Sequence, residues 1–130
     1  MALDRLYPGW DGLEAGAAYA CARILTPRAA GVRATWQEWD WAGARYSEHA
    51  DLAADRAVIV EGSGAITSET APLASIRVWL DAPGELRRHR ALTRDGETYR
   101  PHWDRWARQE ERHVERNRPR EHATHVFEIA

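Results

Sequence analysis

The sequence contains no lysine, and Cys21 is its single cysteine. All 18 cationic residues are therefore arginines, so neither a phosphate-loop lysine nor a Schiff-base lysine is available within these residues. One cysteine permits neither an intrachain disulfide nor a cysteine-rich zinc site. The six histidines are scattered, without an H-E-x-x-H pair, which disfavours a metal site built on histidine.

A strong net charge and long apolar runs are missing as well. The formal net charge is −2, which disfavours a nucleic-acid partner. No apolar run approaches the roughly 18 residues of a membrane span, and no signal peptide opens the chain. We therefore expect a cytoplasmic protein without a membrane partner. The 130 residues predict a single domain spanning 1–130.

Four stretches are predicted to be extended. β-branched and aromatic residues between 32 and 41 indicate a short strand or hairpin arm. Compact apolar runs at Ala57–Val60 and Ile76–Leu80 are typical of parallel strands buried on both faces. Ala123–Ile129 is predicted to be the last strand.

Three stretches are predicted to be helical. Apolar residues recur at helical spacing in Gly12–Leu25, and Pro27 is expected to end that helix. Glu85–Thr93 and Pro101–Asn117 predict two further helices. The alternation of strands and helices is that of an α/β fold with a parallel sheet.

The most informative segment is Leu3–Leu13, which reads Leu-Asp-Arg-Leu-Tyr-Pro-Gly-Trp-Asp-Gly-Leu. It resembles the substrate-side loop of P-loop small-molecule kinases of the uridine kinase and nucleoside kinase type. In that family an aspartate, followed three residues later by a tyrosine, faces the phosphate acceptor. The resemblance implies that Asp4 takes the acceptor's proton and that Tyr7 and Trp10 orient the acceptor. A plain turn residue is the alternative for Asp4.

Two later segments resemble the same family in the same order. Val58–Gly62 is similar to the third sheet strand, whose acidic end lies near the metal, so Glu61 is expected to support Mg²⁺ through water. Leu86–Asp95 is similar to the arginine-rich helix that leads into the lid. Three arginines on one face of that helix are expected to bind phosphates: Arg87, Arg90 and Arg94. A turn acid and a solvated helix face are the alternatives.

Tryptophans are a further source of candidate contacts. Trp39 lies in a Trp-Asp-Trp sequence, at the place where related kinases have an inserted acceptor-binding hairpin. Substrate contact and simple packing are equally compatible with it. Trp103 and Trp106 stand at helical spacing, which favours core positions over a base-stacking platform.

The sequence departs from the family in one major respect, because it contains no G-x-x-x-x-G-K-[ST]. We expect a three-layer P-loop kinase-like parallel sheet that is N-terminally truncated, without its first strand and phosphate loop. Ile76–Leu80 should then pair in parallel with the last strand near Val126. The contact between Ala57–Val60 and Ile76–Leu80 should be the weakest one between strands. ATP binding should be millimolar or weaker, since surface charge pairs contribute only about 0–1 kcal/mol each.

The resemblance implies an ATP-dependent phosphotransferase that moves the γ-phosphoryl group to a hydroxyl of a small molecule, with a nucleoside as the leading acceptor. ATP and Mg²⁺ would be its cofactors in a full-length form. The 130-residue chain itself is expected to be inactive. The alternative is a non-catalytic ligand-binding or interaction protein that retains only the acceptor pocket. Exposed sheet edges would favour self-association in either case.

Overall fold

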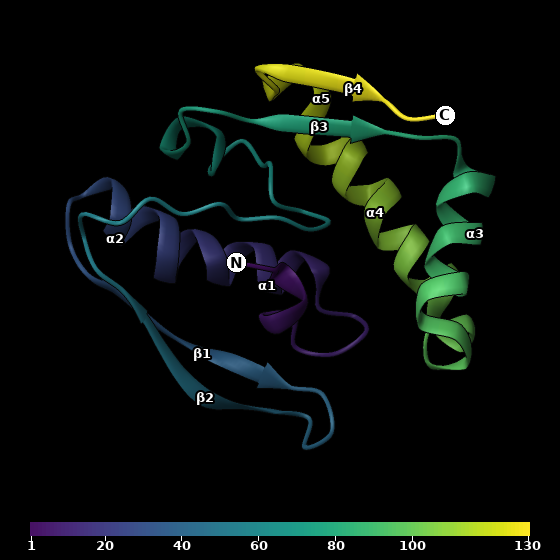
Figure 1. Ribbon diagram of the computed structural model, residues 1–130, viewed down its shortest axis with the longest axis horizontal. Coiled ribbons are helices and arrows are strands. Elements are labelled where there is room, and N and C mark those ends of the chain that lie inside the picture. Colours follow the sequence, from purple (N-terminus) through teal and green to yellow (C-terminus); the bar gives the residue numbers. More distant parts are fainter.

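The computed structural model describes residues 1–130 as a mixed α/β fold, in which helices accompany two separate pairs of strands (Figure 1). One pair is antiparallel and the other is parallel. The strands do not join into one continuous parallel sheet. The structure therefore confirms a mixed α/β fold with one parallel pair of strands. It does not confirm a three-layer P-loop kinase-like sheet.

The N-terminal half is built on a helical segment that is longer than predicted. α1 spans Leu13–Ala20, a π turn follows at Cys21–Leu25, and α2 spans Thr26–Ala29. The prediction that Pro27 ends the helix is wrong, because this proline lies in the first turn of α2. A missing N–H is tolerated there. The segment ends before Gly31, whose φ of +69° is a left-handed conformation that suits glycine.

A β-hairpin follows, as the residues between 32 and 41 predict. β1 spans Ala34–Asp40 and pairs antiparallel with β2, Arg45–Leu52. The register shifts between Gln37 and Trp39, which marks a bulge that redirects the side chains beyond it. The hairpin lies on the opposite side of α1 from the parallel strand pair in Figure 1.

The parallel pair confirms the predicted pairing of the last strand. β3 spans Val78–Asp81 and β4 spans His125–Glu128. Trp79 lies opposite Val126, and Leu80 opposite Phe127. The second edge of β3 has no strand partner.

The predicted strand at Ala57–Val60 is not formed as a strand. It is held only near its end: the Ile59 carbonyl accepts from the Met1 amino group at 2.7 Å, and a parallel bridge follows in which Leu3 N–H donates to the Glu61 carbonyl at 2.9 Å. No backbone N–H between Ala57 and Val60 donates a hydrogen bond within the chain. No ladder joins this stretch to β3, so the contact expected to be the weakest is in fact absent.

Burial of these two apolar runs was also wrongly predicted. Ile59 is 80% exposed, and Leu80 is 59% exposed. No further strand lies on their free edges, and no second layer covers these side chains. Their neighbours on the parallel pair are exposed as well: Ile76, Val78, Val126 and Phe127. Unpaired edges with exposed apolar side chains favour association with another strand.

The C-terminal half is helical, as predicted. α3 spans Gly84–Asp95 and α4 spans Trp103–Asn117. Pro101, the expected start of the second helix, lies instead in a 3-10 turn that leads into α4. The left-handed Arg118 (φ 44°) ends α4, and a short helix α5 follows at Pro119–His122.

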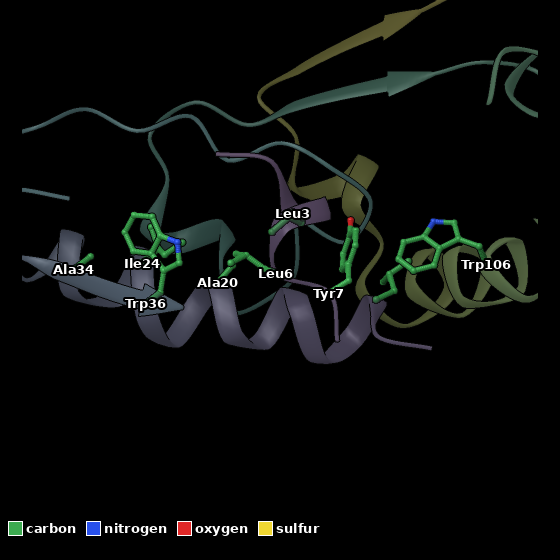
Figure 2. Close-up of a cluster of buried hydrophobic side chains, with 9 residues drawn as sticks. Leu3, Leu6, Tyr7, Ala20, Ile24, Ala34, Trp36 and Trp106 are labelled. Atoms are coloured by element: carbon green, nitrogen blue, oxygen red, sulfur yellow. The ribbon is translucent and has the colours of Figure 1, made fainter. Parts of the chain in front are cut away.

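The buried core is centred on the chain's first residues. Leu3 and Leu6 are fully buried, and Tyr7 is 2% exposed. Figure 2 shows that the cluster lies along the length of α1, with side chains from the N-terminal turn, α1, the π turn, β1 and α4. Its members are Leu3, Leu6, Tyr7, Leu13, Ala20, Ile24, Ala34, Trp36 and Trp106. The segment before α1 is therefore part of the core.

His113 is a buried titratable group on α4. Its ring is 8% exposed, and its Nε2 atom has no hydrogen-bond partner. Burial lowers the pKa of His113, although the charge of Glu110 opposes that shift. The folded state therefore resists protonation of this ring, whereas the unfolded chain takes up the proton near pH 6.5. The unfolded state binds more protons in this window, so acid should favour it.

We predict that the free energy of unfolding falls as the pH is lowered from about 7 to about 5. His113→Gln should reduce that slope, because it removes the group that titrates. Urea unfolding followed by tryptophan fluorescence at both pH values measures the effect. His49→Gln, at an exposed position of β2, is the control and should keep the wild-type slope. An unchanged slope in His113→Gln would contradict the prediction.

Candidate functional site

A cavity of about 660 Å³ lies where the N-terminal loop meets α3 and α4. Its volume is within the range of about 300–1,000 Å³ typical of small-molecule sites. The tip of the hairpin and the chain after Glu61 complete its wall. Aromatic rings, carboxylates and two guanidinium groups form much of the lining.

Most of the predicted site residues meet in this cavity, although they are far apart in the sequence. The lining includes six of them: Asp4, Tyr7, Trp10, Glu61, Arg87 and Arg94. Trp39 and Arg90 do not line it. The three segments that the resemblance assigns to the site thus share one cavity.

Tyr7 holds the N-terminal loop in place from inside the core. Its hydroxyl donates to the Ser63 carbonyl at 2.6 Å. Its ring meets the Trp106 ring edge to face, with 4.7 Å between centroids, and the two lie side by side in Figure 2. Burial, followed by the charges of Asp4, Glu110 and Glu61, raises the pKa of Tyr7 well above its usual value. Tyr7 therefore stays protonated, with its hydroxyl committed to the backbone.

Trp10 forms the centre of an aromatic wall. It stacks nearly parallel on His102, at 4.4 Å between centroids, and on Tyr99 at 5.4 Å. The Trp41 ring packs on the Trp10 ring with the two planes tilted by 55° and 5.1 Å between their centroids. Aromatic pairs in this range stabilise one another by about 0.5–1.5 kcal/mol beyond simple burial. The wall is thus a fixed surface against which a ligand can pack.

Gln109 fixes the same loop from α4. This side chain is 7% exposed, and its Nε2 donates to the Trp10 carbonyl at 2.6 Å. Its Oε1 accepts from the Leu13 N–H at 3.2 Å. Both ends of the buried amide are therefore satisfied, and the loop is joined to α4 where α1 begins.

Asp4 and Glu61 are free carboxylates. Both residues are exposed, and neither forms an ion pair or a side-chain hydrogen bond within the chain. The backbone of Asp4 is fixed, because its carbonyl accepts from Trp41 Nε1 at 2.8 Å. No group of three or more His, Cys, Asp or Glu side chains is placed to hold a metal ion. Glu61 thus has no partner ligands for direct metal binding.

The hairpin reaches the cavity through Trp41 instead of Trp39. Trp39 packs edge to face on Tyr46 at 5.0 Å, within the hairpin itself. Trp41 lies just after the end of β1 and reaches the cavity. Of the two interpretations left open for Trp39, its contact with Tyr46 favours packing within the hairpin. Side chains alternate between the two faces of β1 only within the strand, so this alternation does not determine where the Trp41 side chain points.

The arginines of α3 are divided between two sides. Arg87 and Arg94, seven positions apart, line the cavity, whereas Arg90 donates to the carbonyl of the C-terminal Ala130 at 3.3 Å. Arg87 pairs with Glu110 at 3.0 Å. Arg94 pairs with Asp95 at 2.7 Å, and this hydrogen bond is the main reason why its pKa is raised. Both lining arginines therefore already have a carboxylate partner.

Two lining residues were missed by the sequence reasoning. Glu110 accepts from Ser63 Oγ at 2.5 Å as well as from Arg87, so it joins α3, α4 and the chain after Glu61. Tyr99 stacks on Trp10 and meets Trp103 edge to face at 5.5 Å. Tyr99 lies in the turn before α4, so no helical spacing indicated its contact with Trp103.

The two tryptophans of α4 have distinct environments. Trp106 is 7% exposed, which confirms the predicted core position, and it also forms part of the cavity wall. Trp103 is only partly buried and lines the same cavity. Core packing and ligand contact are thus provided by one helix face.

Comparisons with known proteins give no family for this chain. No protein-family model matches the sequence, and no curated protein matches it significantly. None of the helices combines the length and the apolar character needed to cross a membrane. The cavity and its contacts are therefore the basis for a functional argument.

Gly16 allows the close packing of Tyr7 on α1. A Cβ atom at this position would lie 2.5 Å from Tyr7 Cδ1 and 3.1 Å from Tyr7 Cα. Alanine inside a helix is normally more stable than glycine by about 0.5–1 kcal/mol. Here the clash with a core ring should outweigh that gain, since overpacking typically costs about 1–3 kcal/mol.

We therefore predict that Gly16→Ala lowers the free energy of unfolding by about 1–2 kcal/mol and changes the near-UV circular dichroism of the tryptophans. Urea unfolding measures the first effect. Gly84→Ala is the matched control, because its nearest neighbour would be Arg87 Nη2 at 3.9 Å; it should be neutral or stabilising. A Gly16→Ala protein as stable as the wild type would show that the Tyr7 ring can move freely.

Proposed function

We propose that this chain is the acceptor-binding part of an ATP-dependent phosphotransferase of the uridine kinase or nucleoside kinase type. Such an enzyme transfers the γ-phosphoryl group of ATP to a hydroxyl of a small molecule, with a nucleoside as the leading acceptor. The observation that carries the proposal is the meeting of three motifs in one cavity. The N-terminal loop, Glu61 and two arginines of α3 all line it.

Asp4 is suited to act as the general base. It lies in the lining of the cavity, is exposed, and has no ion-pair partner that would compete for its carboxylate. A base must come within hydrogen-bond reach of the hydroxyl proton that it removes. The hydrogen bond between Trp41 and the Asp4 carbonyl holds this residue's backbone at the cavity.

The aromatic wall is suited to orient the body of the acceptor. Trp10 contacts both Trp41 and Tyr99, and the three rings line the same cavity as Asp4. Holding a hydroxyl in line with its base makes a large contribution to such reactions. Tyr7 contributes indirectly, as a positioning residue, since its hydroxyl is bound to Ser63.

Only some of the groups needed to bind the phosphates of ATP are present among these residues. Phosphoryl transfer requires positive groups around the transferred phosphate, and Arg87 and Arg94 could supply them only by exchanging their carboxylate partners for phosphate oxygens. The sequence contains no lysine, and no group of three metal ligands is formed. These residues alone do not fit ATP and Mg²⁺. Turnover would need a phosphate-binding segment in addition to them.

The free backbone at Ala57–Val60 and the free edge of β3 support the presence of such a segment. The two stretches run in the same direction in Figure 1. No strand ladder forms along Ala57–Val60 or along the second edge of β3, and the Ile59 carbonyl alone is bonded, to the Met1 amino group. A parallel strand that paired there would satisfy these backbone groups. It would also cover exposed apolar side chains such as Ile59 and Leu80. A phosphate loop at its end would lie near Glu61.

A second function has a specific observation in its favour. The cavity is complete without a phosphate-binding segment, because all its walls come from residues 4–110. A non-catalytic ligand-binding protein would need nothing more. Nucleotide dependence separates the two functions, since only the enzyme couples the cavity to ATP.

The test starts from the DNA upstream of the Met1 codon. In-frame translation should give an apolar strand followed by G-x-x-x-x-G-K-[ST], and the longer protein should phosphorylate a small-molecule acceptor with ATP and Mg²⁺. An in-frame stop codon close to Met1 would contradict the enzyme and favour the binding protein. The 130-residue chain is the reference, with an expected ATP dissociation constant of about millimolar or weaker.

In the longer protein, Asp4→Asn should lower kcat by about a hundredfold or more, because a positioned base contributes about 10²–10⁴-fold. ATP affinity should be nearly unchanged, which equilibrium titration measures. Asp11→Asn is the matched control: Asp11 belongs to the same loop but pairs with Arg105 at 3.3 Å and does not line the cavity. Unchanged turnover in Asp4→Asn would show that Asp4 is not the base.

A further inference from the structure

The charges around the cavity do not balance. Each lining arginine is paired with a lining acid, Arg87 with Glu110 and Arg94 with Asp95. Two lining carboxylates remain without a cation: Asp4 and Glu61. Unpaired negative charge beside a cavity attracts a positively charged ligand and repels an anionic one.

The hydrogen bonds within the lining leave these two carboxylates free to bind a ligand. No Asn, Gln, His or Lys side chain lines the cavity. Several neutral donors are already used within the chain, since Tyr7 donates to the Ser63 carbonyl and Ser63 Oγ to Glu110. Trp41 Nε1 donates to the Asp4 carbonyl. The carboxylate oxygens of Asp4 and Glu61 remain available, beside the hydroxyls of Thr98 and Tyr99, which can donate or accept.

Aromatic rings surround these acceptors. Trp10 meets Trp41, Tyr99 and Trp106 with centroids between 5.1 and 6.3 Å apart, and all four residues line the cavity. His102 stacks on one face of Trp10 at 4.4 Å, so a ligand would meet the other rings of this wall as well. The face of an indole or phenol ring attracts a cation that lies within about 6 Å of its centroid, most strongly for tryptophan. A group of tryptophans beside free carboxylates is the combination that recognises organic ammonium ions.

We propose that the acceptor bound in this cavity carries an organic ammonium group in addition to its hydroxyl. The ammonium group would lie against the tryptophans, where the free carboxylates offset its charge, and the hydroxyl would face Asp4. This inference rests on the proposed role of the cavity as the acceptor site. A bound metal ion is a poorer explanation of the free carboxylates, because no group of three ligands is formed.

Choline and 3,3-dimethylbutan-1-ol are suitable probes, because they have nearly the same shape and the same hydroxyl and differ in the charged nitrogen. We would titrate each into the 130-residue chain at low ionic strength without magnesium, following tryptophan fluorescence and calorimetry. Choline should bind at least about tenfold more tightly than the neutral alcohol, and added salt should weaken its binding. Equal affinities, or no choline binding at millimolar concentration, would overturn the inference.

Variants locate the effect in the cavity. Trp10→Leu should weaken choline binding about tenfold, and Asp4→Asn should weaken it about twofold to fivefold without changing affinity for the neutral alcohol. Glu111→Gln removes the same charge from an exposed position of α4 outside the cavity and should leave choline binding unchanged. An equal loss in Glu111→Gln and Asp4→Asn would contradict a local site.

The binding experiment needs no nucleotide, so its failure differs from a failure of the proposed function. If uridine binds and choline does not, the amino group is wrong while phosphotransfer to a neutral acceptor stands. If choline is preferred but the longer protein transfers no phosphate to any amino alcohol, the ligand class stands and the enzyme is wrong.

Discussion

The hydrogen bond from the Tyr7 hydroxyl to the Ser63 carbonyl joins the first residues of the chain to the stretch that follows Glu61. The ring of Tyr7 lies between α1, where only glycine fits at position 16, and Trp106 of α4. A buried hydroxyl is costly unless it is bonded, so the ring has one position. Because the loop is held there, Asp4 and Trp10 on either side of Tyr7 both reach the cavity.

The electrostatics of the cavity follow from the same arrangement. The two arginines that line the cavity are paired with other acids, Arg87 with Glu110 and Arg94 with Asp95, so neither forms an ion pair with Asp4. Asp4 adds to the rise in the pKa of the neighbouring Tyr99, after burial and Glu110. The phenols therefore remain neutral, and the free carboxylates set the charge of the site. The cavity therefore combines a wall of packed aromatic rings with two unpaired carboxylates, Asp4 and Glu61.

The sequence predicted the parts of this structure that depend on local pattern and order. It placed Asp4 and Trp10 at the cavity, two of the α3 arginines beside them, and the last strand in parallel with β3. The sequence-based predictions failed where burial or side-chain direction depends on contacts with other segments. Ile59 and Leu80 are apolar enough for a buried strand, but burial requires a covering layer that the 130 residues do not provide. A bulge after Gln37 and the end of β1 gave the cavity Trp41 instead of Trp39.

The most direct test of this account is the free energy of unfolding of Tyr7→Phe, which removes the hydroxyl and keeps the ring. Loss of the bond to Ser63 should cost about 1–2 kcal/mol and alter the near-UV circular dichroism of the cavity tryptophans. Tyr19→Phe removes a hydrogen bond that the Tyr19 hydroxyl accepts from the Gln37 N–H at 2.9 Å, away from the cavity and from the N-terminal loop. It should leave that spectrum unchanged. A Tyr7→Phe protein with wild-type stability and an unchanged spectrum would contradict the claim that this bond holds the cavity together.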